Sequence, residues 1–211
     1  EFLIPTDHFD TLVQLLELSD PMSDPFLETQ ILRFAVEFAY DRSKRVNFDT
    51  HSTKGYRLFA LFARLITSVT ERKFAQLFND GDLNTDVTVD ALNDVPDIDQ
   101  KYEVTHKQIY LCMALCQRAL SGSYVNFGIF SIYNDPTLDQ ILTAAAKLLT
   151  IVPFEHMQQF SKLAAESFAL LNQLFSHHMR FVASLPSATV LHMLHCIEAS
   201  MLGVHLPAHV L

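Results

Sequence analysis

The sequence contains few of the residues that build tight turns. Its 211 residues include only 5 glycines and 8 prolines, and an all-β fold needs many turns made from these residue types. Cysteine is scarce as well, because Cys112, Cys116 and Cys196 cannot form the disulfide framework of a small secreted domain. These shortages argue against an all-β or a secreted, disulfide-stapled protein and favour a reducing, intracellular compartment.

Long hydrophobic runs and positive charge are also missing. No apolar run reaches the roughly 18 residues that indicate a membrane-spanning helix. Lys and Arg number 15 against 24 Asp and Glu, which gives a net charge of −9, whereas nucleic-acid binding needs a basic face that contacts phosphates. We therefore expect neither membrane insertion nor a nucleic-acid partner.

Motifs that identify enzymes are absent from the chain. No Ser, Cys or Thr lies in a recognisable nucleophile elbow, and no glycine-rich loop is present that would cradle a phosphate. Gly122-Ser123-Tyr124 is predicted to be a turn between two helices. We expect no catalytic residues and no cofactor.

One acidic segment begins like a calcium-binding loop. Asp80, Asp82 and Asn84 have the spacing of its first three ligands, but Thr85 occupies the position that must be glycine. Ala91 occupies the position of the bidentate glutamate. The segment is therefore predicted to be a solvated acidic loop, with an electrostatic contact to a basic partner as the alternative.

A group of histidines near the C-terminal end suggests zinc at first sight. No Cys-x-x-Cys pair accompanies them, and their spacing does not match that of a zinc site. We expect them to lie at a helix surface or an interface, and we expect no metal site. The group comprises His192, His195, Cys196, His205 and His209.

Apolar residues recur at helical spacing along most of the chain, which predicts an all-α fold. Asp24-Pro25 and Asp135-Pro136 each supply an N-cap residue followed by a proline at the first helical position. Phe62 and Leu171 lie at the centres of two stripes and are predicted to be buried, as are Cys112 and Cys116, which behave as small hydrophobes. The main stripes cover Phe9–Leu16, Leu27–Phe38, Leu58–Val69, Ile109–Ala119, Leu138–Val152, Leu163–Phe175 and Val190–Met201, with short helices near Tyr124–Tyr133 and Phe154–Phe160.

The stretch Asn79–Glu103 interrupts this pattern. It carries −7 of the net charge and almost no helical period, which predicts a mobile acidic loop within a single helical segment that covers residues 1–211. A short basic segment, Tyr40–Asp49, ends an earlier helix. The candidate partner-binding residues in these two stretches are Asp80, Asp82, Asp86, Asp90 and Asp94, together with Arg42, Lys44 and Arg45.

Two seams between helices carry a family resemblance. Tyr40–Asp49 reads YDRSKRVNFD, and Ala119–Asp139 reads ALSGSYVNFGIFSIYNDPTLD. Together with Lys147–Pro153 and His178–Leu185, they resemble the exportin branch of the karyopherin-β nuclear transport receptors. The resemblance runs from about Ile31 to about Met201 and breaks between about Thr70 and Glu103.

This resemblance implies a HEAT-repeat α-solenoid with inner and outer helix layers, of which the chain would hold about four complete or incomplete helix pairs. It implies a segment from the C-terminal third of a longer export receptor. Such a receptor binds Ran-GTP and protein cargo cooperatively and shuttles between nucleus and cytoplasm past Phe-Gly nucleoporins. The main Ran site would lie outside this segment. The alternative is a helical-repeat scaffold that binds other proteins without Ran.

Overall fold

The computed structural model is all-helical, as the sequence predicts. It describes residues 25–39, 53–79, 106–122, 125–152, 154, 157 and 160–201, and these residues contain eight helices and no strand. The predicted helix Phe9–Leu16 and most of Phe154–Phe160 lie outside the described residues. The helices are α2 (Pro25–Ala39), α3 (Thr53–Asn79), α6 (Lys107–Ser121), α7 (Gly128–Ile132), α8 (Thr137–Ile151), α10 (Ser161–His177), α11 (Met179–Val182) and α12 (Ser187–Met201).

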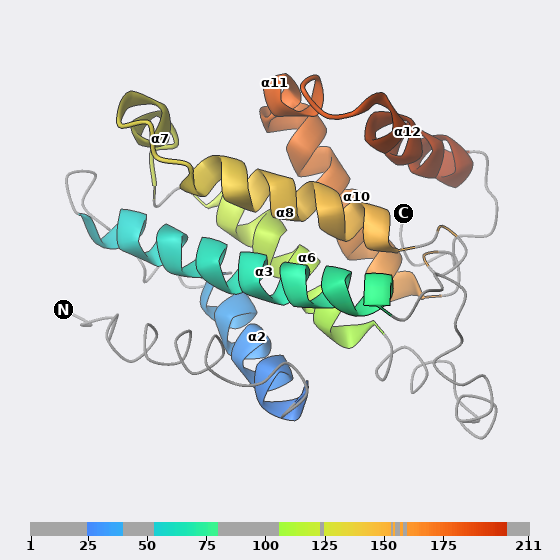
Figure 1. Ribbon diagram of the computed structural model, residues 1–211, viewed down its shortest axis with the longest axis horizontal. Coiled ribbons are helices and arrows are strands. Elements are labelled where there is room, and N and C mark those ends of the chain that lie inside the picture. The colour runs from blue at the N-terminus through green and yellow to red at the C-terminus, as the bar shows by residue number, and fades with distance from the viewer. Residues whose placement is uncertain are drawn as a thin grey trace.

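The six long helices form two layers. In one layer α6 packs between α2 and α10, and in the other α8 packs between α3 and α12. Contacts of α6 with α3 and α8 join the layers, and Figure 1 shows α3 and α8 side by side in front of α6. Two parallel rows of helices are the arrangement of an α-solenoid, so the predicted inner and outer layers are present as three pairs among the described residues.

The structure also reveals a period that the sequence did not show. A short helix follows the first long helix of each complete unit, giving α6–α7–α8 and then α10–α11–α12. The first residues of corresponding helices are 107 and 161, 128 and 179, and 137 and 187, so the offsets are 54, 51 and 50. A period of about 50 residues is in the range of helical-repeat proteins. The two units share a structural plan, although their side chains differ.

Burial is greatest in α6, the helix at the centre of the first layer. Its buried residues lie all around the helix and not on a single face. Cys112 and Cys116 are fully buried there, and Phe62 of α3 and Leu171 of α10 are buried as well. The predictions for these four residues are confirmed.

Two predicted apolar faces are partly wrong. On α2, the predicted Leu27–Phe38 stripe is buried at Ile31, but Phe34 within it is 52% exposed. The core-facing side of α2 is shifted, because Leu32 and Val36 are buried as well. On α12, the predicted stripe included Leu194 and Met201. The residues that α12 buries are Met193, Cys196 and Ala199, and its main neighbour among the described helices is α8.

The predicted start at Asp135-Pro136 is one residue too early, because α8 begins at Thr137 and its N-cap residue is Pro136, not Asp135. Asp135 Oδ1 accepts a hydrogen bond from the Thr137 backbone N–H at 2.8 Å, which satisfies one of the free donors at a helix start. The Gln140 N–H donates to the Pro136 carbonyl, so Pro136 already takes part in the helical pattern. At the other predicted start, α2 begins at Pro25.

Candidate partner-binding site

The residues nominated from the sequence are not placed by the structure. Asp80, Asp82, Asp86, Asp90 and Asp94 lie outside the described residues, as do Arg42, Lys44 and Arg45. Both groups therefore remain predictions, and so does the acidic loop to which the aspartates belong.

An aromatic cluster joins the start of α3 to α7. Phe59 packs between Phe127 and Phe130, with ring centroids 5.4 and 5.1 Å from its own. Tyr56 stacks on Phe130 at 5.4 Å. Each such ring pair contributes about 0.5–1.5 kcal/mol of stability beyond the effect of the apolar area that it buries. The cluster fixes the short α7 against the body of the molecule, even though α7 has only five residues.

A polar contact reinforces this cluster. The Tyr56 hydroxyl donates to Asp135 Oδ2, while the other carboxylate oxygen accepts a hydrogen bond from the backbone N–H of Thr137, the first residue of α8. Hydrogen bonds from Thr137 and Tyr56 hold the pKa of Asp135 below its usual value, because they stabilise the charged carboxylate. The same bond to Asp135 raises the pKa of Tyr56. This part of the Ala119–Asp139 seam therefore positions helices and leaves no reactive group exposed.

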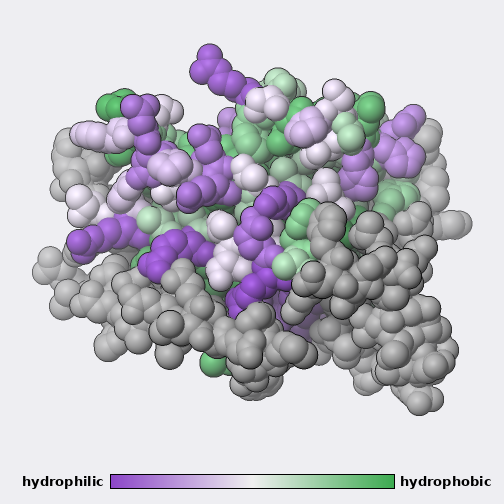
Figure 2. Space-filling view, viewed as in Figure 1, coloured by the Kyte–Doolittle hydropathy of each residue, from purple (hydrophilic) through white to green (hydrophobic). Residues whose placement is uncertain are grey.

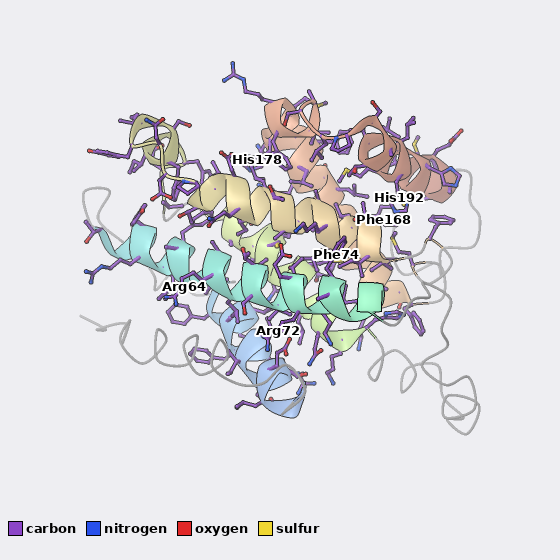
Figure 3. The ribbon with its side chains drawn as sticks, in the orientation of Figure 1. Arg64, Arg72, Phe74, Phe168, His178 and His192 are labelled. Carbon is purple, nitrogen blue, oxygen red and sulfur yellow. The ribbon has the colours of Figure 1, made fainter. Side chains whose placement is uncertain are left out.

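A cavity of about 570 Å³ opens beside the cluster, between α7 and the end of α10. We call it the α7–α10 pocket. Its size is within the range of ligand-binding clefts, which is about 300–1,000 Å³. The pocket lies between corresponding parts of the two repeat units, and Figure 3 shows His178 between α7 and α11, above α8. Its described lining residues are Leu120, Ser121, Gly122, Phe127, Gly128, Ser131, Leu138, Gln173, His177 and His178.

Two polar side chains that line this pocket, Gln173 and His178, have buried polar atoms. Gln173 Nε2 donates to the Leu120 carbonyl at 3.0 Å, which ties the last turn of α6 to α10. The His178 ring packs edge-on against Phe127, and its Nε2 is buried without a hydrogen-bond partner. Burial, followed by the nearby His177, lowers the pKa of His178, so the imidazole is neutral at physiological pH.

Exposed apolar side chains lie on α7, α11 and α12. Ile132 and Tyr133, which end α7, are 75% and 77% exposed, and Met179 at the start of α11 is 54% exposed. On α12, Leu191, Leu194 and Met201 are exposed as well. Figure 2 shows apolar residues mixed with polar ones along the upper edge of the molecule.

Two ion pairs between helices have a structural role. Arg72 of α3 lies 3.6 Å from Glu28 of α2, and nearby Lys73 has a lowered pKa because it is buried. On the other side of α3, Lys147 pairs with Glu71 and lies 5.4 Å from the centre of the Phe74 ring. These contacts connect α3 to α2 and to α8.

The histidine and cysteine residues of α12 do not assemble a metal site among the described residues. His192 Nε2 lies 3.3 Å from the Leu149 carbonyl and 3.8 Å from Cys196 Sγ. His195 packs against Phe154. His205 and His209 lie outside the described residues. His192 therefore helps to fix α12 to the end of α8.

The buried thiols of α6 also lack the environment of a reactive site. Burial raises the pKa of both Cys112 and Cys116 far above the usual range, so they remain protonated and poorly nucleophilic. Within the described part of the chain, no helix is long and apolar enough to cross a membrane.

Comparison with known proteins gives relatives that match most of this chain. No family model matches, and no solved structure matches. Exportin-7-B of Xenopus laevis is 33% identical over 178 residues, which cover 84% of this chain and 15% of that protein. Human Ran-binding protein 17 is 29% identical over the same shares of the two chains.

A third relative extends the match slightly. Ran-binding protein 16 of Drosophila melanogaster is 27% identical over 194 residues, which cover 92% of this chain and 16% of that protein. The chain thus spans about one sixth of the length of these relatives. Their names and the extent of the similarity confirm the predicted resemblance: this chain is a homologue, over most of its length, of one segment of the exportin-7 and Ran-binding protein 16 and 17 group.

Proposed function

We propose that the chain is a segment of a nuclear export receptor that binds Ran-GTP and protein cargo cooperatively. The observation that carries this proposal is the similarity to exportin-7 over 84% of the chain. The names of the Ran-binding relatives support Ran as a partner. The two-layered helical array supplies a suitable scaffold, because stacked repeats form extended surfaces that engage whole proteins.

In this proposal the receptor performs no chemistry of its own and uses no cofactor. Ran-GTP and cargo each favour a curvature of the solenoid that suits the other, so their binding free energies are coupled. Hydrolysis of GTP on Ran then removes the coupling and releases cargo in the cytoplasm. The receptor crosses the nuclear pore by contacts with Phe-Gly nucleoporins, and it shuttles between nucleus and cytoplasm.

The segment 1–211 contributes one stretch of the array to this receptor, with the principal Ran site in another part. The acidic insertion at about 79–103 would attract a basic patch on Ran, cargo or a neighbouring repeat. The basic seam at Arg42, Lys44 and Arg45 would hold neighbouring repeats together or meet a partner. These roles rest on charge in the sequence.

The experiment compares the two nucleotide states of Ran. A full-length receptor that contains this segment is immobilised and incubated with Ran loaded with GTP or GDP, with and without a bound cargo. We expect much tighter binding of Ran-GTP and a further increase when cargo is present. Equal affinity for both nucleotide states would favour the alternative function, a helical scaffold that binds proteins without Ran.

A further inference from the structure

We propose that the outward face of α12 is an interface that receives a further helical unit of the same receptor. The outward face consists of the exposed residues Leu191, Leu194, His195, Glu198 and Met201. The proposal rests on the placing of this chain within a longer receptor, and it is independent of Ran and cargo. It is supported by the register of the repeat and by a polar contact that recurs between successive helices.

The two complete units keep one register from their short helices onward. α8 begins at residue 137 and α12 at residue 187, and each has 15 residues. The Gln140 N–H donates to the Pro136 carbonyl, and its counterpart fifty positions later donates to the Pro186 carbonyl. The N–H groups that close α7 and α11 show the same spacing. Each residue of α12 therefore has a counterpart fifty positions earlier in α8.

The counterparts of the five outward-facing residues are all buried in α8. They are Ile141, Ala144, Ala145, Leu148 and Ile151. α8 lies between α3 and α12 in its layer and also contacts α6 (Figure 1), whereas the main neighbour of α12 among the described helices is α8. The same positions are thus covered in the unit that packs between two others and open in the unit that follows it. The outward face of α12 has the location expected of the next contact in the row.

The outward face also has the chemistry of a helix–helix contact. Leu191 and Met201 are 65% and 82% exposed, and Leu194 between them is 45% exposed. Their spacing of three and seven residues places these side chains along one side of the helix. Glu198 alone among the five residues carries a full charge. An apolar stripe of this kind is suited to packing against the stripe of another helix.

A polar contact recurs between successive helices of the two layers. In three cases a side chain of the later helix reaches a backbone carbonyl in the last turn of the helix before it. Arg118 Nη1 of α6 donates to the Val36 carbonyl of α2 at 3.0 Å, Gln173 Nε2 of α10 donates to the Leu120 carbonyl of α6 at 3.0 Å, and His192 Nε2 of α12 lies 3.3 Å from the Leu149 carbonyl of α8. The last four carbonyls of any helix lack an intrahelical partner, so every helix end offers such an acceptor.

This recurrence defines the chemistry of the occupant. We expect a helix with an apolar stripe to lie along the outward face and to carry an Arg, Gln or His side chain that reaches the last turn of α12. The carbonyl fifty positions after that of Leu149 belongs to Ala199. Only a unit built on the same plan continues both the register and the polar contact. The matched segments make up 15% and 16% of two of the relatives, so a receptor of this group has ample chain to form such a unit.

Hydrogen exchange of the backbone amides of α12 tests the proposal. Exchange over Ser187–Met201 is followed by mass spectrometry in the 211-residue chain and in a full-length receptor that contains it, both without Ran or cargo. We expect these amides to exchange at least about tenfold more slowly in the receptor, because a covered helix opens less often. Equal exchange rates in the two proteins would overturn the proposal, because they would show that the outward face stays open within the receptor.

Matched variants show whether the protection comes from the outward face. Leu191→Lys keeps a high helix propensity and should speed exchange over α12 about tenfold in the receptor, where it buries a charge, but less than about threefold in the 211-residue chain. The control is Ala183→Lys, because Ala183 is exposed and so is its counterpart Tyr133. It should change exchange over α12 less than about twofold in both proteins. Equal effects of the two variants in the receptor would overturn the proposal.

Two further results would assign the outward face to another occupant and so overturn the proposal. If light scattering shows that the receptor is a dimer that Leu191→Lys converts to monomers, the occupant is a second copy. If α12 becomes protected in the receptor only after cargo is added, the occupant is the cargo. Circular dichroism establishes that each variant is folded. Because the main comparison contains neither Ran nor cargo, its failure leaves the proposed transport function untouched.

Discussion

Helices α6 and α12 have the same length, 15 residues, and both are rich in apolar side chains, yet they differ greatly in how many of their residues are buried. Nine residues of α6 are buried, against three of α12. Leu191 and Met201 of α12 are 65% and 82% exposed. Similar composition therefore leads to a core helix in one place and to a peripheral helix in another.

The difference arises from the number of neighbours that each helix has. α6 packs against α2 and α10 in its own layer and against α3 and α8 in the other, whereas the main neighbour of α12 among the described helices is α8. In a helical array each unit is stabilised by the units on both sides. Burial in such a fold depends on position in the array as much as on the apolar pattern of the helix itself.

The largest expected effect tests this contrast directly. Leu115→Ala in α6 should lower the free energy of unfolding by about 2–5 kcal/mol, because a fully buried side chain leaves a cavity. Phe62→Ala and Leu171→Ala should fall in the same range for the same reason. The measurement is urea denaturation followed by circular dichroism.

The matched control for these variants is Leu191→Ala in α12. It should change the free energy of unfolding by no more than about 0.5 kcal/mol, because the side chain is already exposed to solvent. Equal losses for Leu115→Ala and Leu191→Ala would show that the outer face of α12 is packed against something in solution and that the contrast between the two helices is wrong.

A smaller loss of stability is expected on removal of two hydrogen bonds that each join one long helix to the last turn of another, one at α6 and one at α12. Gln173 donates to a carbonyl in the last turn of α6, and His192 contacts a carbonyl in the last turn of α8. Gln173→Met should cost about 1–3 kcal/mol, because the Leu120 carbonyl loses its partner in a buried site. His192→Met should cost less than about 1 kcal/mol, because this contact is only partly buried and water can replace the ring.

Thermal unfolding measures the loss of unfolding free energy in each of the two variants relative to the unmodified chain. A larger loss for His192→Met than for Gln173→Met would mean that α12 depends on a polar anchor and not on packing. The two variants together therefore test whether α12 is held against α8 by packing or by a polar contact.

The smallest effect is expected outside both regions. Deletion of Gly81–Asp99 should leave the melting temperature nearly unchanged, because the segment lacks an apolar stripe and a change in loop length alters closure entropy by only about 0.6 kcal/mol per doubling. In the full-length receptor, the deletion should weaken partner binding at low salt and have little effect at 1 M salt, where the Debye length is about 3 Å. A large fall in melting temperature would instead show that the segment packs against the helices, and unchanged affinity at low salt would remove its electrostatic role.

Several local features could be predicted from the sequence because they depend on neighbouring residues. The Asp135-Pro136 pair located the start of α8 to within one residue, because a proline has a fixed φ angle and lacks an N–H, which favours a helix start. The burial of Phe62, Leu171 and the two cysteines of α6 followed from apolar neighbours three and four positions away. The resemblance to exportins rested on contiguous seams and is confirmed by the relatives.

Other features required the tertiary structure because they depend on residues far apart in the chain. The period of about 50 residues shows in the order of long and short helices and not in the side chains, which differ between the two units. The exposure of Phe34 and Leu194 depends on which neighbours their helices meet. The α7–α10 pocket joins the ends of α6 and α10, separated by more than fifty positions in the sequence.

The sequence by itself determined that the chain is helical, where several of its helices begin and which relatives it has, because periodicity, caps and contiguous motifs are local properties of a polypeptide. Only the tertiary structure decided which apolar faces are covered and where two helix ends converge on one cavity. Those outcomes depend on the packing of whole helices into layers, and the same amphipathic helix can occupy the centre or the edge of an array.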